Sequence, residues 1–204
     1  MSPDYPQTVR LGLFAAGAFA RGRSRLVEAV WMCVQAGLVG SWLPGSRHRV
    51  ALLRLFGARI GNGVVVKPGV RVKFPWRLSM GDHCWIGERA WIDNLAAVTL
   101  GDDVCISQGA YLCTGNHDWS DPAFALITRP ITLLDGSWVG AKALIAPGVT
   151  LGVCAVASAG SVITKSIPDF EIHAGNPAAP VRQRQITPCH KFQPSITSTH
   201  PTTS

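Results

Sequence analysis

From residue 60 onward, an aliphatic side chain recurs at every sixth position, with two-residue slips and one long interruption. The fifth residue of each six-residue unit is also restricted, because eleven of the fifteen are Ala, Ser or Val. Gly follows the aliphatic residue in six units. The aliphatic positions are Ile60, Val66, Val72, Met80, Ile86, Ile92, Leu100, Ile106, Leu112, Leu133, Val139, Ile145, Leu151, Ala157 and Ile163.

A period of six excludes a helix as the repeating unit, because 3.6 residues per turn would carry the aliphatic positions around the helix surface. Three short strands of about six residues can instead close into a triangular coil. Each aliphatic side chain then points inward and stacks on its equivalent one coil away, about 4.8 Å along the axis. The pattern therefore predicts an all-β chain whose repeats form about five coils of parallel β-helix.

The repeat divides the chain into four parts. Residues 1–59 precede it and form an apolar, basic arm that we expect to be helical. Residues 60–167 form the β-helix, and residues 113–132 leave it as a long loop, which in a regular solenoid usually serves function. Residues 168–186 are predicted to run back along the outside. Residues 187–204 are rich in Thr, Ser and Pro and are predicted to be disordered.

The positive charge of the chain is concentrated in the arm. Residues 1–59 hold eight arginines against two acidic residues, whereas residues 60–204 hold eleven basic and ten acidic residues. We find no aromatic-flanked basic face or recognition motif, so no nucleic-acid partner is expected. A basic, apolar arm fits an anionic membrane surface better.

Two apolar segments of the arm leave alternatives open. Residues 11–20 follow Arg10 and end in Ala-Phe-Ala, which matches a signal peptide loosely. Residues 26–43 hold only Glu28 and Gln35 as strongly polar residues. That segment is a helix packed on the domain, a helix lying in the membrane interface, or a membrane span.

The amino-acid composition excludes two further classes of protein, disordered chains and zinc proteins. Hydrophobic residues make up 47% of the chain and charged residues 15%, which excludes wholesale disorder. The six cysteines form no CxxC pair and no spacing typical of zinc, so we expect reduced thiols and no metal.

Five stretches resemble the hexapeptide-repeat acyltransferases, in particular the colanic acid and exopolysaccharide biosynthesis acetyltransferases. The resemblance covers about residues 50–185 and implies a left-handed β-helix. The stretches are WRLSMGDHCWIGERAWIDNLA (76–96), CISQGAYLCTGNHDWSDPAF (105–124), SWVGAKALIAPGVTLG (137–152), and AGSVITKSIP (159–168) with AGNPAAPVR (174–182).

The resemblance implies an O-acetyltransferase that moves an acetyl group from acetyl-CoA to a sugar hydroxyl. His117, in the long loop, matches the family's general base, and an imidazole that titrates near neutrality suits that role. Asn116 or Asp118 is expected to orient its ring. The backbone N–H of Ala141 matches the donor that stabilises the oxyanion. Cys113 has no activating base other than His117, so we do not expect a covalent intermediate.

The resemblance also implies where the co-substrate and the acceptor bind. Trp138, Ala141, Ala159, Thr164 and Lys165 match segments that hold the pantetheine arm and phosphates of acetyl-CoA. Pro177-Ala178-Ala179-Pro180 departs from relatives that carry a basic residue there, so Arg182 or Arg184 is expected to contact phosphate. The expected acceptor residues are Asp93, Asn94, Asn116 and Asp118, with Trp85, Trp91 and Trp119 as aromatic neighbours.

The resemblance implies a homotrimer with active sites between subunits. The arm would bring the enzyme to the inner face of the cytoplasmic membrane, near a lipid-linked saccharide. The alternatives are a non-catalytic membrane scaffold and an acyltransferase for another hydroxyl or an amine. A zinc enzyme on the same fold needs three converging histidines, and Pro122 stands where one would lie. A nucleotidyltransferase needs a nucleotide-binding domain that 59 residues cannot form.

Overall fold

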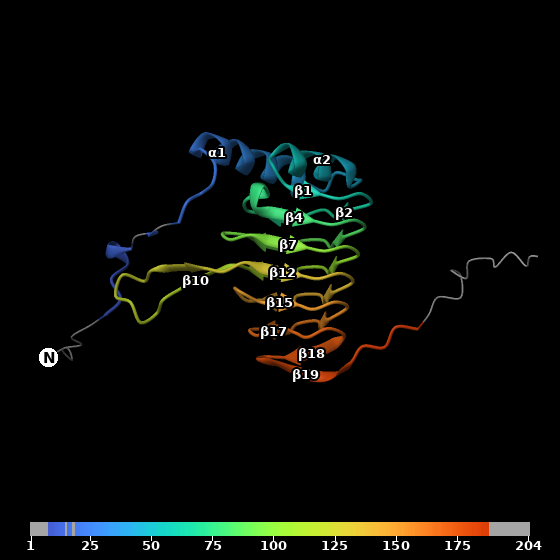
Figure 1. Ribbon diagram of the computed structural model, residues 1–204. Helices are drawn as coiled ribbons and strands as arrows, with labels where there is room; N and C mark the ends of the chain where they lie inside the picture. Colours follow the sequence, from blue (N-terminus) through green and yellow to red (C-terminus); the bar gives the residue numbers. More distant parts are fainter. Residues whose placement is uncertain (1–7, 15, 18, 188–204) are drawn as a thin grey trace, which may run out of the picture.

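The computed structural model describes residues 8–14, 16–17 and 19–187. The prediction of a disordered tail over 187–204 falls outside this range, apart from residue 187. The described chain is a column of stacked coils with helices over one end and a hairpin that projects from its side (Figure 1).

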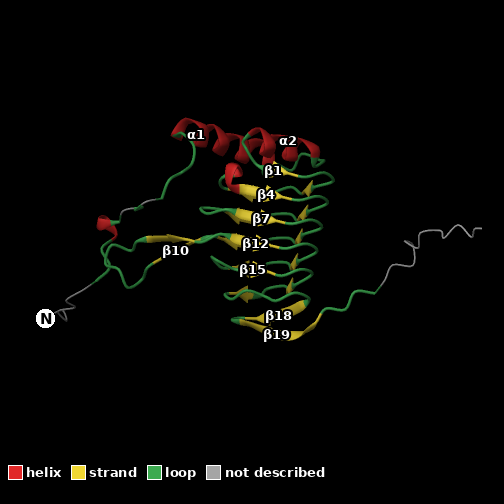
Figure 2. Cartoon of the chain, viewed as in Figure 1, coloured by secondary structure: helices red, strands yellow, loops and turns green. Residues whose placement is uncertain are grey.

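Five coils of three strands each form the column, which confirms the predicted parallel β-helix. Corresponding strands pair in parallel into three sheets along the axis (Figure 2). The first sheet contains β1 (Arg59–Ile60), β4 (Leu78–Met80), β7 (Val98–Leu100), β12 (Ile131–Leu133) and β15 (Thr150–Leu151). The second contains β2 (Val65–Val66), β5 (Trp85–Ile86), β8 (Cys105–Ile106), β13 (Trp138–Val139) and β16 (Val156–Ala157). The third contains β3 (Arg71–Val72), β6 (Trp91–Asp93), β9 (Tyr111–Cys113), β14 (Leu144–Ile145) and β17 (Val162–Ile163).

The aliphatic positions of the repeat form the core. Ile106 pairs with Ile86 on one side and with Val139 on the other, so equivalent side chains stack along the axis. Fourteen of the fifteen positions are buried, and Ile60, in the first coil, is half-buried. Each coil thus contributes one layer of apolar side chains to a continuous core.

One corner of the column is held by a ladder of aspartates. The Asp102 carboxylate accepts a hydrogen bond from the Asp82 N–H at 2.7 Å, and Asp135 accepts from the Asp102 N–H at 2.9 Å. The residue before each donor must be Gly, because a Cβ on Gly101 would lie 2.0 Å from the Asp135 carboxylate. The glycines that follow aliphatic positions therefore allow the coils to approach closely.

The basic arm forms a helical cap over the first coil. It contains α1 (Arg25–Val34), a π-helical turn η2 (Gln35–Val39) and α2 (Arg47–Leu55), with a short 3-10 turn η1 (Leu11–Leu13) before them. Trp31 is buried and its indole N–H donates to the Val72 carbonyl at 2.9 Å. Residues 26–43 therefore pack on the β-helix. No helix among the described residues is both long and apolar enough to cross a membrane.

The prediction that residues 168–186 run back along the outside is wrong. Strand β18 (Glu171–Gly175) instead pairs in parallel with β16 and begins a sixth turn. Strand β19 (Ala178–Gln183) folds back antiparallel on β18 and ends the second sheet. The extension continues the column because its backbone groups satisfy the exposed edge of β16.

Candidate active site

The segment predicted to leave the repeat is a β-hairpin that projects from the column. Strand β10 (Gly115–His117) pairs antiparallel with β11 (Leu126–Thr128), and His117 lies opposite Leu126. Beyond the hairpin the chain re-enters the column, where β12 pairs directly with β7. The insertion therefore leaves the stacking of the coils unbroken.

The backbone of the hairpin fixes the His117 ring. Its Nδ1 lies 2.9 Å from the carbonyl oxygen of Phe124, which can only accept, so Nδ1 carries the proton and Nε2 of the neutral ring is an acceptor. The Phe124 ring stacks on the imidazole, with centroids 4.2 Å apart and planes 7° apart. Phe124 has a φ of 52°, a conformation that a bulky residue rarely adopts. The geometry of this turn thus selects the tautomer.

The expectation that Asn116 or Asp118 orients the His117 ring is wrong. The Asn116 side chain accepts from the backbone N–H of His117 at 2.8 Å, not from the ring. The Asp118 carboxylate accepts from the backbone N–H and the hydroxyl of Ser120. These bonds, led by the hydroxyl, lower the pKa of Asp118. Both side chains shape the hairpin, and the Phe124 carbonyl orients the ring.

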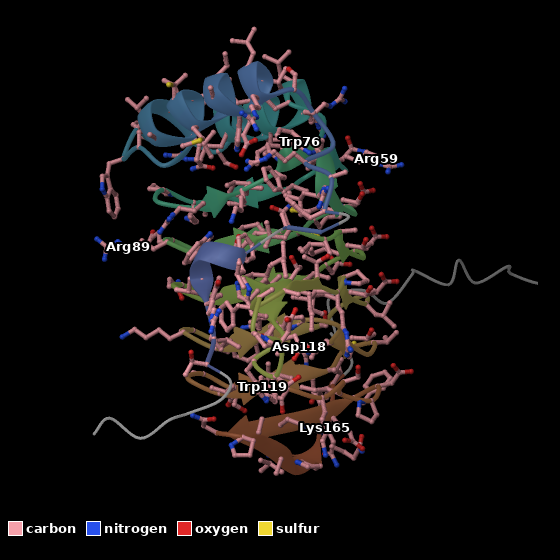
Figure 3. All side chains as sticks on the ribbon, turned by 90° about the vertical axis from the view of Figure 1, so that its left-hand side faces the viewer. Arg59, Trp76, Arg89, Asp118, Trp119 and Lys165 are labelled. Atoms are coloured by element: carbon pink, nitrogen blue, oxygen red, sulfur yellow. The ribbon has the colours of Figure 1, made fainter. Side chains whose placement is uncertain are left out.

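A cavity of about 460 Å³ lies beside His117. The hairpin contributes Asn116, Asp118 and Trp119 to its lining, and the column contributes Thr164. Arg129 gives the cavity a cationic side chain. Figure 3 faces the hairpin side of the molecule, where Asp118 and Trp119 lie in front of the lower coils and Lys165 lies below them.

A second cavity, of about 550 Å³, lies along the second sheet and groups four of the expected co-substrate residues. Trp138 is 44% exposed beside it, and its indole N–H donates to the Ser107 hydroxyl at 2.8 Å. The four residues in the lining are Trp138, Ala141, Ala159 and Arg182. This surface offers an aromatic face, turn backbone and a guanidinium within one groove.

The Ala141 amide belongs to a tight turn at this second cavity. The Ala143 N–H closes the turn on the Gly140 carbonyl at 3.1 Å, and Lys142 has a φ of 57°. Among the residues that the structure describes, none accepts a hydrogen bond from the Ala141 N–H. A second-position N–H in such a turn points outward, where a ligand oxygen can accept from it.

The two cavities share no lining residue. The first cavity is reached from the hairpin and the end of the third sheet, whereas the second lies on the outer face of the second sheet. Within the described chain, His117 and Ala141 therefore line different cavities.

Asp93 and Asn94, expected to contact the acceptor, lie at a corner of the column. The Asp93 carboxylate forms an ion pair with Lys73 at 3.1 Å and accepts from the Tyr111 hydroxyl at 3.1 Å. Burial is the main cause of a raised pKa at Tyr111, to which the nearby Cys113 and Asp93 add. Asn94 is fully buried, and its amide bonds both the N–H and the carbonyl of Phe74. Asn94 therefore holds two coils together.

The remaining basic residues occupy different surroundings. Lys165 is exposed and follows Thr164, which lines the His117 cavity. Arg182 and Arg184 both line the Trp138 cavity, but Arg184 donates to the carbonyls of Gly136 and Cys154. Arg182 is the freer of the two arginines to meet a phosphate.

Two site residues escape a reading of the sequence. Phe124 acts through its carbonyl and its ring, and a backbone carbonyl has no signature in the sequence. Arg129 lines the His117 cavity because it directly follows β11. Its position just before Pro130, where the chain returns to the repeat, is the sequence feature that could have marked it as a site residue.

Comparison with known proteins places these features in a family. The family model described as "Hexapeptide repeat of succinyl-transferase" matches residues 77–113 and 130–165, on either side of the hairpin. A candidate colanic acid biosynthesis acetyltransferase, WcaF of Escherichia coli, is 39% identical over 169 residues, which cover 82% of this chain and 92% of WcaF. The galactoside O-acetyltransferase of Escherichia coli is 29% identical over 66% of this chain and 68% of its own length.

Solved structures show the same fold. The hexapeptide-repeat acetyltransferase VCA0836 from Vibrio cholerae superposes with a TM-score of 0.72 at 26% identity, over 79% of this chain and 92% of that chain. Its complex with acetyl coenzyme A gives a TM-score of 0.75 at 23% identity, over 85% and 97% of the two chains.

Proposed function

Because this chain belongs to the hexapeptide-repeat acyltransferases and is an acetyltransferase, we propose that it transfers an acetyl group from acetyl-CoA to a sugar hydroxyl in exopolysaccharide biosynthesis. The likeness to WcaF supports a colanic acid-like polysaccharide as the end product. The likeness to a galactoside O-acetyltransferase supports a sugar acceptor. The observation that carries the proposal is the tautomer of His117, whose Nε2 is held ready to accept a proton.

In this mechanism the sugar hydroxyl approaches Nε2 of His117. Nε2 takes the hydroxyl proton as the oxygen attacks the thioester carbonyl carbon, and the Phe124 carbonyl stabilises the imidazolium through Nδ1–H. The Ala141 N–H donates to the oxyanion of the tetrahedral intermediate. The intermediate then expels the CoA thiolate, which takes the proton back from Nε2.

The separation of the two cavities supports a homotrimer. His117 of one chain and Ala141 of the partner subunit would then meet in a groove between two columns. The exposed indoles of Trp85 (59%) and Trp138 (44%) lie on the outer face of the second sheet, where a neighbouring hairpin would cover them. An isolated monomer would lack one half of the site.

Within that groove, the acetyl-CoA residues come from both cavities. Trp138, Ala141 and Ala159 would line the pantetheine arm, and Arg182 would pair with phosphate. Thr164 and Lys165 would approach from the His117 side. We assign acceptor contacts to Asn116, Asp118 and Asp93, and we leave Asn94 to its structural role.

The outer face of the cap supports a location at the inner surface of the cytoplasmic membrane, where acetyl-CoA is available. A surface helix is usually apolar on one face only, but α1 buries Trp31 and also exposes Leu26 (74%) and Val30 (47%). Glu28, the one acidic side chain in the described part of the arm, pairs with Arg21. The other exposed arginines of the arm, which do not include the buried Arg49, favour an anionic lipid bilayer over any other cover.

Anionic vesicles test this location through Cys33, which is exposed on the outer side of α1. We expect vesicles with 30% phosphatidylglycerol to slow maleimide labelling of Cys33, and neutral vesicles not to. Leu26→Glu should abolish the protection and vesicle sedimentation. The matched control is Leu134→Glu, because Leu134 is 38% exposed on the column, away from the cap. Equal labelling with and without anionic vesicles would contradict the membrane location.

The enzymatic proposal is tested by release of free CoA from acetyl-CoA against a panel of sugars and lipid-linked saccharides. We expect release that depends on a sugar and falls about 100-fold or more in His117→Ala, the scale of a lost general base. His83→Asn is the matched control, since His83 is exposed at a turn with a φ of 56° that Asn tolerates. Failure to bind acetyl-CoA would overturn the proposal and favour a scaffold.

A further inference from the structure

The N-terminal segment reaches the proposed active site of the same chain. After η1, Phe14 places its ring 5.8 Å from the His117 ring, with the planes inclined at 61°. The Arg10 N–H donates to the Pro122 carbonyl at 2.8 Å, in the same turn that holds Phe124. Residues 10–14 thus contact the hairpin at both the catalytic ring and the turn that orients it.

The other end of this segment is fixed to the column. The indole N–H of Trp76 donates to the Arg21 carbonyl at 2.8 Å, and the Arg77 guanidinium donates to the Ala20 carbonyl. Arg77 also lies over the Phe19 ring, 5.0 Å from its centroid. The segment is therefore attached at residues 19–21 and again at residues 10–14. Figure 1 shows it running from the cap to the outer end of the hairpin.

The hairpin needs such a support. It projects from the column, and strands β10 and β11 bond to each other and to no strand of the three sheets. A base must hold its reacting atom within a few tenths of an ångström, and a 1 Å misplacement costs rate steeply. Phe124 fixes the imidazole from within the hairpin, whereas Phe14 contacts it from outside.

We propose that Phe14 is a positioning residue for His117, held in place by a strap of residues 10–14 across the hairpin. The proposal rests on the proposed role of His117 as general base. Phe14 limits rotation of the His117 imidazole about the Cβ–Cγ bond. It thereby keeps Nδ1 toward the Phe124 carbonyl and Nε2 toward the acceptor. The strap contributes no group to the chemistry.

The test compares Phe14→Ala, Phe14→Tyr and Leu11→Ala in the full-length chain. Leu11 is the matched control, since it lies in the strap and is 67% exposed. We expect Phe14→Ala to lower kcat about 5- to 20-fold with the KM for acetyl-CoA and the thermal midpoint unchanged. Phe14→Tyr should restore at least half of the activity, and Leu11→Ala should stay within twofold of wild type.

A readout independent of turnover separates this proposal from the enzymatic one. The ring protons of His117, assigned by comparison with His117→Ala, should shift in NMR spectra of Phe14→Ala because an adjacent aromatic ring is lost. Unchanged His117 signals would overturn the strap even if acetyl transfer is established. A loss of activity in Leu11→Ala equal to that in Phe14→Ala would also overturn it. A shift of the signals in a chain without transferase activity would confirm the contact between the strap and the His117 ring, but would refute the enzymatic proposal and with it the positioning role.

Discussion

Gly140 marks a place where the spacing of the coils and the proposed oxyanion donor depend on one another. A Cβ at this position would lie 2.5 Å from the Ala159 nitrogen and 2.8 Å from the Ala157 oxygen. Both atoms belong to the backbone of the next coil, so no side-chain rotation relieves the contact. Gly140→Ala must push two coils apart and stretch the bond from the Gly140 N–H to the Ala157 carbonyl, which is 2.7 Å long.

The cost of this substitution has two parts. Overpacking a well-packed interior costs about 1–3 kcal/mol, and weakening a buried hydrogen bond costs about 1 kcal/mol. We therefore expect the free energy of unfolding to fall by about 3 kcal/mol. With an m-value of about 2–3 kcal/mol/M, the urea midpoint should drop by about 1 M. Since Ala141 follows directly, the displaced turn should also lower kcat at least 10-fold, toward the loss seen when an oxyanion donor is removed.

Urea unfolding followed by circular dichroism measures the first effect, and CoA release in the folded protein measures the second. Gly37→Ala is the matched control, because a Cβ on Gly37 in the π-helical turn meets nothing within 4 Å. That variant should keep its midpoint or gain about 0.5–1 kcal/mol from reduced freedom of the unfolded chain. A Gly140→Ala midpoint within 0.2 M of wild type would refute the argument from coil spacing.

Three further predictions concern the cap, the thiols and the hairpin. Arg49 is fully buried and donates to four backbone carbonyls between α1 and α2, so Arg49→Lys should destabilise the cap by about 2–3 kcal/mol. Amide exchange over residues 35–50 should become faster, and unchanged exchange would contradict this role. Burial raises the pKa of the Cys84 thiol, so peptide-resolved alkylation at pH 8 should modify exposed Cys33 well before Cys84, and the reverse order would show that the core opens readily. The Ser120 hydroxyl lowers the pKa of Asp118, so Ser120→Ala should raise this pKa in a carbon-detected NMR titration. Because the pKa of Asp118 is lower in the folded chain, its contribution to hairpin stability is present above the unfolded pKa and is lost as the pH falls through the folded pKa.

The repeat could be predicted because each coil places the same kind of side chain inward at the same interval. The corner at the end of each of the first three coils could not be predicted, because there the slips change the spacing. Trp76 and Asn116 stand at fifth positions of the repeat without being small, whereas Phe74, Asn94 and Thr114 fill the corner, and Asn116 lies in the hairpin. From the sequence alone, Asn94 resembles a residue that binds the acceptor. Its structural role is not visible there, because its partner is the backbone of another coil.

The site residues divide in the same way. Most of the residues matched through family motifs line one of two cavities, because the motifs follow the coils, whereas Lys165, Asp93 and Asn94 line neither. The contacts of Phe14 and Phe124 with His117 depend on a long-range approach and on a left-handed φ of 52°, and neither has a periodic pattern in the sequence. Tertiary packing decides both, so they had to be seen in the structure.

The way the hairpin leaves the column has a consequence for divergence within the family. Val98 pairs with Ile131 and Leu100 with Leu133, as if the intervening residues did not exist. The hairpin can therefore change in length or composition without shifting the register of any coil, while the groove beside Trp138 stays fixed. If the proposed division of the site holds, replacement of the hairpin changes the proposed acceptor side and leaves the proposed acetyl-CoA groove unchanged. Transplanting residues 113–130 between relatives is thus the natural route by which acceptor preference, but not the acyl donor, would be altered.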